Sequence, residues 1–439
     1  MIKNKKAIWS FIGLLFLFGT LQASFAWGFG LLAMTPWWQG ALAVITILFT
    51  TIVSSFLVVK SLFKVKDPKK EELKFQANFY RAYFKKSFDA LWRIQAKTSA
   101  NPYHTPWYLY LNENYDDDRE LIQQMGYEPI ELEEKYNNEN APISFWLNET
   151  SVLVCVHQTS PSEKLQQATD LLIKHLLKKR PRQAVNGVIL GVSIRDLLAS
   201  DSGGVSNKGK KDRNLIRHFN QAFGLNLPIY SIFTHMAELR DFCEIFSTLD
   251  ERQRDQAFGA LVPNVSQLEF DKKWFDESFE SLQKSISDCL SNALKSQLNT
   301  DYRDAIVAGT FQFSILKSTL ENYFNSLFID HQFEGKALYF RGYFFANAGG
   351  EARPIDPLTM MQASDLGYEQ LAKQELVKKN LSLFGKRLMR SILVKEAAIV
   401  GVQSRREFTY RITRVFVTGG LLVIFGGVLW ILKSSFDFQ

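Results

Sequence analysis

The longest uncharged stretch of this chain, residues 7–59, contains no Asp, Glu, Lys, Arg or His. One membrane-spanning helix needs about 20 apolar residues, so this stretch is long enough for two spans and must fold back on itself. The run Thr35-Pro36-Trp37-Trp38-Gln39-Gly40 contains helix-breaking residues and two tryptophans, which settle at membrane–water interfaces. The stretch therefore predicts two antiparallel spans, at residues 8–34 and 41–59.

Charges beside the apolar segments predict their orientation. Lysines flank the hairpin on both sides: Lys3, Lys5, Lys6, Lys60, Lys64, Lys66, Lys69 and Lys70. A third uncharged segment, residues 415–432, follows a group of arginines. Because positively charged flanks stay in the cytoplasm, we expect a multi-pass membrane protein with a cytoplasmic N-terminus and main domain and a C-terminus on the opposite side of the membrane. A cleaved signal peptide ending near Ala26 is the alternative, but its apolar region would be longer than usual.

Charge and cysteine usage set further limits on function. The net charge of +7 requires no nucleic-acid partner, because much of the excess lies beside the spans, where anionic lipid attracts Lys and Arg. The three cysteines, Cys155, Cys243 and Cys289, do not have the short spacing of a metal site. We interpret them as structural thiols, and we predict no metal site and no cofactor.

Hydrophobic periodicity predicts the elements between the spans. Residues 69–96 have the pattern of a basic amphipathic helix, which either packs on its own domain or lies on a membrane or a partner. Short apolar runs then alternate with amphipathic helices, as in a parallel sheet with helices on its faces. These predicted strands are residues 107–111, 152–156, 187–192 and 228–233.

The pattern becomes mostly helical beyond residue 270. Phenylalanine and leucine recur at helical spacing there, and an aromatic strand is predicted at residues 338–345. A final helix is predicted over residues 376–402. The whole chain is thus divided into a transmembrane hairpin, a linker helix, an α/β domain, a helical extension and a third span with a short periplasmic end. Their predicted bounds are 1–63, 64–100, 101–270, 271–412 and 413–439.

Several short runs, taken together in their order and spacing, resemble the IcmF/TssM membrane proteins of type VI secretion systems, which have a relative in the Dot/Icm type IVB system. The matching runs are Pro106-Trp107-Tyr108-Leu109, Arg180-Pro181-Arg182-Gln183, Asn186-Gly187-Val188-Ile189-Leu190, Leu227-Pro228-Ile229-Tyr230, Phe258-Gly259, Phe340-Arg341-Gly342-Tyr343-Phe344 and Arg353-Pro354-Ile355-Asp356. The resemblance covers nearly the whole chain. It implies a P-loop-NTPase-like cytoplasmic domain, shaped like a small GTPase.

The nucleotide motifs of that family are degenerate in this sequence. Where many members have G-x-x-x-x-G-K-[ST], Asn112 and Asp117 replace the outer glycines, Asp118 the lysine and Arg119 the hydroxyl residue. This segment also carries four carboxylates that would repel a triphosphate: Glu113, Asp116, Asp117 and Asp118. The family's D-T-A-G reads Cys155-Val156-His157-Gln158, and its T-K-x-D reads Thr234-His235-Met236-Ala237. The resemblance therefore implies a GTPase fold retained without nucleotide.

Three other patterns resemble phosphate-binding, metal-binding or catalytic sites. The run Gly204-Val205-Ser206-Asn207-Lys208-Gly209-Lys210 fits G-x-x-x-x-G-K, but it follows a predicted helix end and lacks the final Ser/Thr, so we expect a flexible basic loop. The acidic run at residues 115–120 is interpreted as a solvated helix start, and its spacing does not match an EF-hand. Cys155 and His157 point in parallel from one strand, so they cannot form a nucleophile–base pair. We assign no catalytic, cofactor-binding or metal residue.

The sequence thus predicts a scaffold, not an enzyme: a component of a type VI secretion membrane core complex that anchors and assembles partners at the bacterial inner membrane. The resemblance implies a TssL/DotU-type inner-membrane partner, cytoplasmic baseplate components, an oligomer, and an outer-membrane lipoprotein only if a periplasmic region follows this chain. Three alternatives stay open. They are an IcmF component of a type IVB system, a noncanonical membrane-bound NTPase, and a sensor that binds anionic lipid through residues 204–211.

Overall fold

A computed structural model of the chain describes residues 68–96, 101, 103–113, 118–130, 132, 142–160, 162–296, 300–329, 337–352, 354–357, 377–379, 381–390 and 394–400. Within these residues, no helix has the length and apolar character needed to cross a membrane. The three predicted spans lie outside the described residues and stay predictions. The chain forms two compact units, Met1–Gln76 and Ala77–Gln439, and the described part of the first is the start of one helix.

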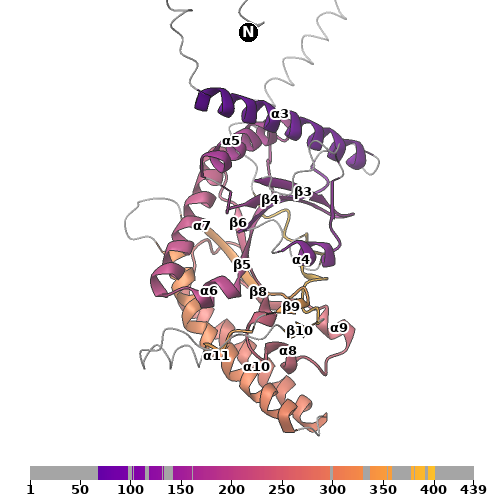
Figure 1. Cartoon of the computed structure of the whole chain (residues 1–439), viewed down its shortest axis with the longest axis vertical. Helices are drawn as coiled ribbons and strands as arrows, with labels where there is room; N and C mark the ends of the chain where they lie inside the picture. Colours follow the sequence, from indigo (N-terminus) through magenta and orange to yellow (C-terminus); the bar gives the residue numbers. More distant parts are fainter. Residues whose placement is uncertain are drawn as a thin grey trace, which may run out of the picture. The chain divides into compact units, whose positions relative to one another are not determined.

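An eight-stranded sheet lies in the second unit, in the order β2-β3-β4-β1-β5-β6-β8-β7 (Figure 1). Its strands are β1 (Trp107–Asn112), β2 (Glu128–Pro129), β3 (Ile143–Leu147), β4 (Val152–His157), β5 (Gly187–Ser193), β6 (Pro228–Thr234), β7 (Phe258–Leu261) and β8 (Tyr339–Phe345). The four predicted apolar strands are confirmed as β1, β4, β5 and β6, and every one of their residues is buried. Uninterrupted apolar runs form these strands because both faces of the sheet are covered.

The predicted parallel sheet is confirmed for its central strands, and the structure adds antiparallel strands at both edges. β1 is parallel to β4 and β5, and the parallel pairing continues through β6 to β8. β3 is antiparallel to β4, and β7 is antiparallel to β8. A tight turn forces the first reversal: the side-chain oxygen of Asn148 accepts hydrogen bonds from the backbone N–H groups of Thr150 and Ser151, at 2.8 and 2.7 Å. Strands joined by so short a turn can pair only antiparallel.

The two faces of the sheet are covered differently. The first face carries the long helices α3 (Pro68–Gln95), α5 (Ser162–Lys179), α7 (Ser202–Phe223), α10 (Lys272–Ser296) and α11 (Thr300–Phe328), whose buried side chains form one core with alternate strand residues. The second face is covered by the six-residue helix α4 (Arg119–Gln124) and by Leu388 and Met389. The described layer over the second face is therefore much thinner.

Short elements complete the described fold. They are α6 (Ile194–Ala199), η2 (Met236–Glu238), α8 (Phe242–Ile245), α9 (Glu251–Arg254) and a small sheet of β9 (Gly350–Ala352) with β10 (Val377–Lys379). The predicted amphipathic helix at residues 69–96 is confirmed as α3. Of its two interpretations, packing on its own domain is correct, because Phe84 and Phe88 are buried against Phe145 of β3 and His175 of α5.

The C-terminal part of the described chain departs from the predicted elements. The predicted strand at residues 338–345 is confirmed as β8, which lies between β6 and β7 in the sheet. The prediction of one continuous helix over 376–402 is wrong, since the described part begins with β10 and only residues 388–390 of it are helical. Phe384 has a left-handed backbone, with φ of 62°, and a helix cannot continue through such a residue.

Candidate functional site

The sheet order places a candidate site at the carboxyl end of β1. The chain moves from β1 to β4 on one side and to β5, β6 and β8 on the other, so the strand order reverses beside β1. In open α/β sheets, ligands bind outside the carboxyl ends of the strands at such a reversal. The residues at this point are Asn112, which ends β1, with Glu113 after it, and His157, which ends β4, with Gln158 after it. They belong to the segments where the sequence predicted degenerate nucleotide motifs.

Neutral side chains fill one half of this site. Asn112 and His157 are paired across β1 and β4, and the Asn112 side-chain oxygen lies 2.8 Å from His157 Nδ1. His157 Nε2 lies 3.0 Å from the hydroxyl of Ser144, which also accepts a hydrogen bond from Trp146 Nε1 at 3.0 Å. Both ring nitrogens of His157 are therefore engaged with protein groups, and burial lowers the pKa of His157 to about 4. This histidine is neutral at pH 7.

Charged side chains fill the other half. Lys208 of α7 lies between two carboxylates: its Nζ is 2.5 Å from Glu113 Oε1 and 3.5 Å from Asp212 Oδ2. Lys211 also reaches Glu113, at 3.4 Å. The almost fully buried Asp212 accepts further hydrogen bonds from Gln158 Nε2 at 2.7 Å and Tyr323 Oη at 2.8 Å. We call these residues the switch-point network: Asn112, Glu113, Ser144, His157, Gln158, Lys208, Lys211, Asp212 and Tyr323.

The charges within the switch-point network balance one another. Burial by itself would lower the pKa of Lys208, but Asp212 and Glu113 outweigh burial and raise it. Burial likewise tends to raise the pKa of Glu113, yet Lys208 and Lys211 hold it below its ordinary value. The lysine is thus held charged between two acceptors. A further cation or a phosphate at this point would have to displace a partner that the protein already supplies.

The structure corrects the prediction for residues 204–211. They are not a flexible loop but the first turns of α7, which begins after Asp201, whose side chain caps the helix by accepting a hydrogen bond from the Gly204 N–H at 2.7 Å. Gly209 is required by packing, because a Cβ atom there would lie 2.8 Å from the carbonyl oxygen of Tyr323 on α11. The G-x-x-x-x-G-K pattern is therefore a helix packing motif in this fold.

The acidic segment after β1 also differs from its prediction. Glu113 is paired with lysines, so it is not part of a repulsive group of acids. Asp118 is buried, and its carboxylate fits beside the Tyr110 hydroxyl over Gly191, where a Cβ atom would lie 2.7 Å from Asp118 Oδ2. Burial and then Asp118 raise the pKa of Tyr110 well above its ordinary value. Asp116 and Asp117 lie outside the described residues.

The remaining residues considered as sites have structural environments. Cys155 is fully buried, and burial raises the pKa of its thiol far above the ordinary value, so the thiolate is strongly disfavoured. Thr234 ends β6, and His235 after it has a left-handed backbone with its Nδ1 2.9 Å from the Thr234 hydroxyl. Within the described part of the chain, no group of His, Cys, Asp or Glu side chains is arranged to hold a metal ion.

A second charged cluster, at β6 and β8, was not predicted from the sequence. Arg341 of β8 is 2% exposed at its side chain and contacts Glu396 through two nitrogens, Nη2 at 2.5 Å and Nε at 3.1 Å. Tyr230 of β6 donates a hydrogen bond to the same carboxylate at 2.7 Å. We call Arg341, Tyr230 and Glu396 the Glu396 cluster. The only signal in the sequence is that Tyr230 and Arg341 belong to the quoted family runs.

Further contacts attach the segment around Glu396 to the start of β5. Asn186 Nδ2 donates to the carbonyl of Ala397 at 2.9 Å, and the Asn186 side-chain oxygen accepts from the Trp107 N–H at 3.0 Å. The buried guanidinium of Arg180 donates to the carbonyls of Gln183 and Thr105, both at 3.2 Å. The family runs around residues 107, 180, 186, 230 and 341 thus build the attachment of residues 394–400.

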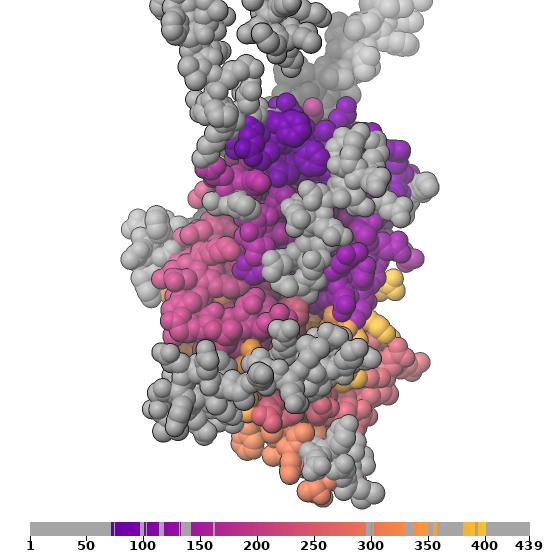
Figure 2. Space-filling view, in the orientation of Figure 1, coloured from indigo at the N-terminus to yellow at the C-terminus, as the bar shows by residue number. Residues whose placement is uncertain are grey.

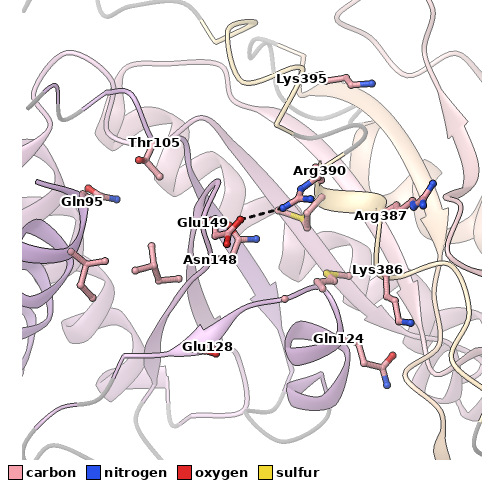
Figure 3. Close-up of a pocket in the computed structure, with 15 residues that line it drawn as sticks. Gln95, Thr105, Gln124, Glu128, Asn148, Glu149, Lys386, Arg387, Arg390 and Lys395 are labelled. Atoms are coloured by element: carbon pink, nitrogen blue, oxygen red, sulfur yellow. Dashed lines mark ion pairs between the residues drawn. The ribbon is translucent and has the colours of Figure 1, made fainter. Parts of the chain in front are cut away.

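A large open cavity of about 1210 Å³ lies away from the switch-point network (Figure 3). Four of its lining residues are cationic: Lys386, Arg387, Arg390 and Lys395. Lys386 is paired with Glu251 at 3.0 Å, and Arg390 lies 3.5 Å from Glu149 across the cavity mouth. Arg390 and Glu149 are 73% and 89% exposed, so this pair is well solvated and weak.

The buried His157 predicts a specific pH dependence of stability. Its pKa of about 4 in the folded protein lies below the ordinary value of about 6.5, so the unfolded chain binds more protons between these values. The neutral His157 therefore contributes about 3 kcal/mol to the free energy of unfolding. This contribution is fully present above about pH 6.5 and is lost as the pH falls toward 4. Denaturant titrations at several pH values measure this slope. His157→Asn should flatten it, whereas His104→Gln, at an exposed position, should leave it unchanged.

The fold and the site together define the class of this domain: it is an α/β domain with a P-loop-like sheet order and a side-chain network at the switch point. Residues 163–421 match the IcmF-related N-terminal domain family, and this chain belongs to that family. The chain is also 26% identical over 326 residues to the type VI secretion system component TssM1 of Pseudomonas aeruginosa. That alignment covers 70% of this chain and 29% of the relative, so the chain spans under a third of its length.

Solved structures give a more distant likeness. The cytosolic domain of the FeoB iron transporter of T. maritima, in its GDP forms II and I, aligns with 9% and 11% identity. The alignments cover 49% and 51% of this chain and 96% and 98% of those chains, with a TM-score of 0.18 in each. A TM-score this low supports no inference about nucleotide binding by the present chain.

Proposed function

We propose that this chain is a scaffold component of the membrane core complex of a type VI secretion system and acts there without hydrolysing nucleotide. Family membership and the likeness to TssM1 support a role in secretion, and the name of that relative favours a type VI over a type IVB system. The observation that carries the absence of hydrolysis is the switch-point network, in which Lys208 is held between Glu113 and Asp212.

The chemistry of phosphate binding supports this proposal. A P-loop needs a lysine that is available to the terminal phosphates, backbone N–H groups at the start of a long helix, and a carboxylate acting through magnesium. Here Lys208 and Lys211 are paired with protein carboxylates, and the described helix that follows β1 has six residues. In β4, the fully buried Cys155 stands where the family motif has its magnesium-linked carboxylate. The energy for secretion would then come from other components.

The location and partners form the second part of the proposal. The predicted spans at residues 8–34, 41–59 and 415–432 would anchor the chain in the bacterial inner membrane, with the described α/β domain in the cytoplasm. We expect a TssL/DotU-type inner-membrane protein and cytoplasmic baseplate components as partners, and several copies of the chain in one assembly. An outer-membrane lipoprotein joins this set only if a periplasmic region follows residue 439.

Calorimetric titration tests the absence of nucleotide binding. We expect the full chain in lipid nanodiscs to give no saturable heat with ATP or GTP and Mg²⁺ up to about 1 mM, which corresponds to less than about 4 kcal/mol of binding free energy. Lys210→Met, at the lysine position of the G-x-x-x-x-G-K pattern, is the matched variant and should behave identically. Micromolar binding by the unmodified chain would contradict the proposal and favour a noncanonical NTPase.

A further inference from the structure

One exposed surface of the second unit is strongly basic. The part of α3 from Ala77 to Gln95 carries four exposed cations and one carboxylate, Asp89, and the last nine residues of α5 carry three exposed lysines and no acid. We call these seven cations the basic face: Arg81, Lys85, Lys86 and Arg93 of α3, and Lys174, Lys178 and Lys179 of α5. Figure 2 shows α3 in indigo at the surface of the molecule.

The packing of α3 explains why its cations are exposed. With 3.6 residues per turn, Lys86 and Arg93 lie opposite the buried Phe84, Phe88 and Leu91, while Arg81 and Lys85 lie on one flank of the helix, between the buried and the outer sides. Phe88 and Phe84 also contact His175 of α5, with ring centroids 6.2 and 5.8 Å apart. The core contacts therefore fix which side of the helix faces outward.

A contact between the two helices joins their cations into one surface. Lys179 Nζ lies 3.5 Å from Asp89 Oδ1, so the last turn of α5 lies beside the C-terminal part of α3. Asp89, which is the one acid in these two stretches, is thus already paired within the surface. The basic face keeps a large positive excess after this pair is counted, and such a surface attracts an extended anionic partner.

The short connection between the second predicted span and α3 favours a lipid surface as the partner. Under the proposed function, on which this inference rests, the second span ends at residue 59, and α3 begins at Pro68. The eight connecting residues can reach at most about 30 Å, so α3 must start close to the membrane. The connection itself contains Lys60, Lys64 and Lys66. Phe75, in the first turns of the same helix, is 75% exposed, as expected for an aromatic residue that meets the headgroup region.

We propose that the basic face docks on the anionic phospholipid headgroups of the membrane that anchors the chain. The seven cations supply electrostatic attraction to phosphodiester groups, and the buried aromatic side of α3 holds the surface to the α/β domain. Docking would fix the domain at a defined orientation to the membrane. It requires no conformational change within the described domain.

The test measures the distance of the basic face from lipid in the full chain. A dye is attached to Asn78→Cys, an exposed uncharged position on α3, in a Cys289→Ser background, and the chain is placed in nanodiscs. The discs contain either phosphatidylcholine alone or phosphatidylcholine with roughly one quarter phosphatidylglycerol, with headgroup-nitroxide lipid as quencher. We expect at least about five-fold stronger quenching in the anionic discs, and loss of this difference near 1 M salt.

Two charge-matched variants separate this surface from net charge. The combined change Lys85→Gln, Lys86→Gln, Arg93→Gln and Lys178→Gln should abolish the dependence on anionic lipid. The control Lys210→Gln, Lys273→Gln, Lys284→Gln and Lys295→Gln removes four exposed lysines from α7 and α10 and should preserve it. Equal quenching in both kinds of disc, or equal effects of the two variants, would contradict the docking proposal and leave the proposed function intact. A chain that alkaline carbonate extracts from membranes would instead overturn the proposed anchoring and docking with it.

Discussion

Glu396→Ala is expected to destabilise the folded domain by about 3–5 kcal/mol, because it leaves the buried guanidinium of Arg341 without its carboxylate. Glu396 accepts from two nitrogens of Arg341 and from the Tyr230 hydroxyl, so one substitution removes three charge-assisted hydrogen bonds. Denaturant unfolding of the chain in detergent, followed by near-ultraviolet circular dichroism, measures the loss. Lys395→Ala, at the exposed neighbouring position, is the control and should change stability by less than about 0.5 kcal/mol.

A compensating variant separates charge burial from general damage. Replacing both partners, with Arg341→Met and Glu396→Met, removes the unpaired charge and should recover most of the stability, as apolar replacements of buried ion pairs commonly do. The hydrogen bonds from Asn186 and Gln183 to the backbone of residues 397 and 400 are unaffected by either change. If Glu396→Ala costs no more than Lys395→Ala, the Glu396 cluster does not attach this segment.

Lys208→Met is expected to cost about 3 kcal/mol or more, since it removes the cation between Glu113 and the almost fully buried Asp212. Asp212 keeps its hydrogen bonds from Gln158 and Tyr323, and Glu113 keeps Lys211, so the loss should stay below complete unfolding. The same substitution should raise the pKa of Glu113, whose low value depends on Lys208. Unfolding curves at pH 7 and carboxyl titration by NMR provide the two readouts.

The neighbouring Lys210 gives this prediction a matched control. Lys210 is exposed and occupies the lysine position of the G-x-x-x-x-G-K pattern, whereas Lys208 occupies a variable position of it. A phosphate-binding loop predicts that Lys210→Met is the damaging change, and a packed helix predicts the reverse. A larger loss of stability in Lys210→Met than in Lys208→Met would therefore contradict the switch-point network as described.

Local patterns identified most of the sheet because its central strands are buried on both faces. Uninterrupted apolar runs predicted β1, β4, β5 and β6 to within one residue at each end. The two edge reversals were missed, because β3 is short and two of its five residues are partly exposed. The start of α7 was missed for a different reason. Its glycines are poor helix formers, and the Asp201 cap together with the packing of Gly209 on α11 outweighs that preference.

The sequence predicted the position of the candidate site but not the contacts between its residues. The degenerate motif after β1 marked the correct end of the sheet, since a strand followed by a polar segment is a local feature. The partner of Glu113 lies 95 residues away, at the start of α7, where the local sequence predicts a loop. No spacing rule connects two such residues. Their contact depends on α7 lying across the carboxyl ends of β1 and β4.

The sequence by itself determined the apolar strands, the amphipathic α3, the loss of the nucleotide motifs and the family resemblance. Each of these features depends on short runs of residues that are close together in the chain. Only the tertiary structure decided what the charged residues do. Lys208 meets Glu113 and Asp212, and Glu396 meets an arginine 55 residues away. A charged side chain has the same local pattern whether it is solvated or paired, and only the folded packing removes water from one and supplies a partner to the other.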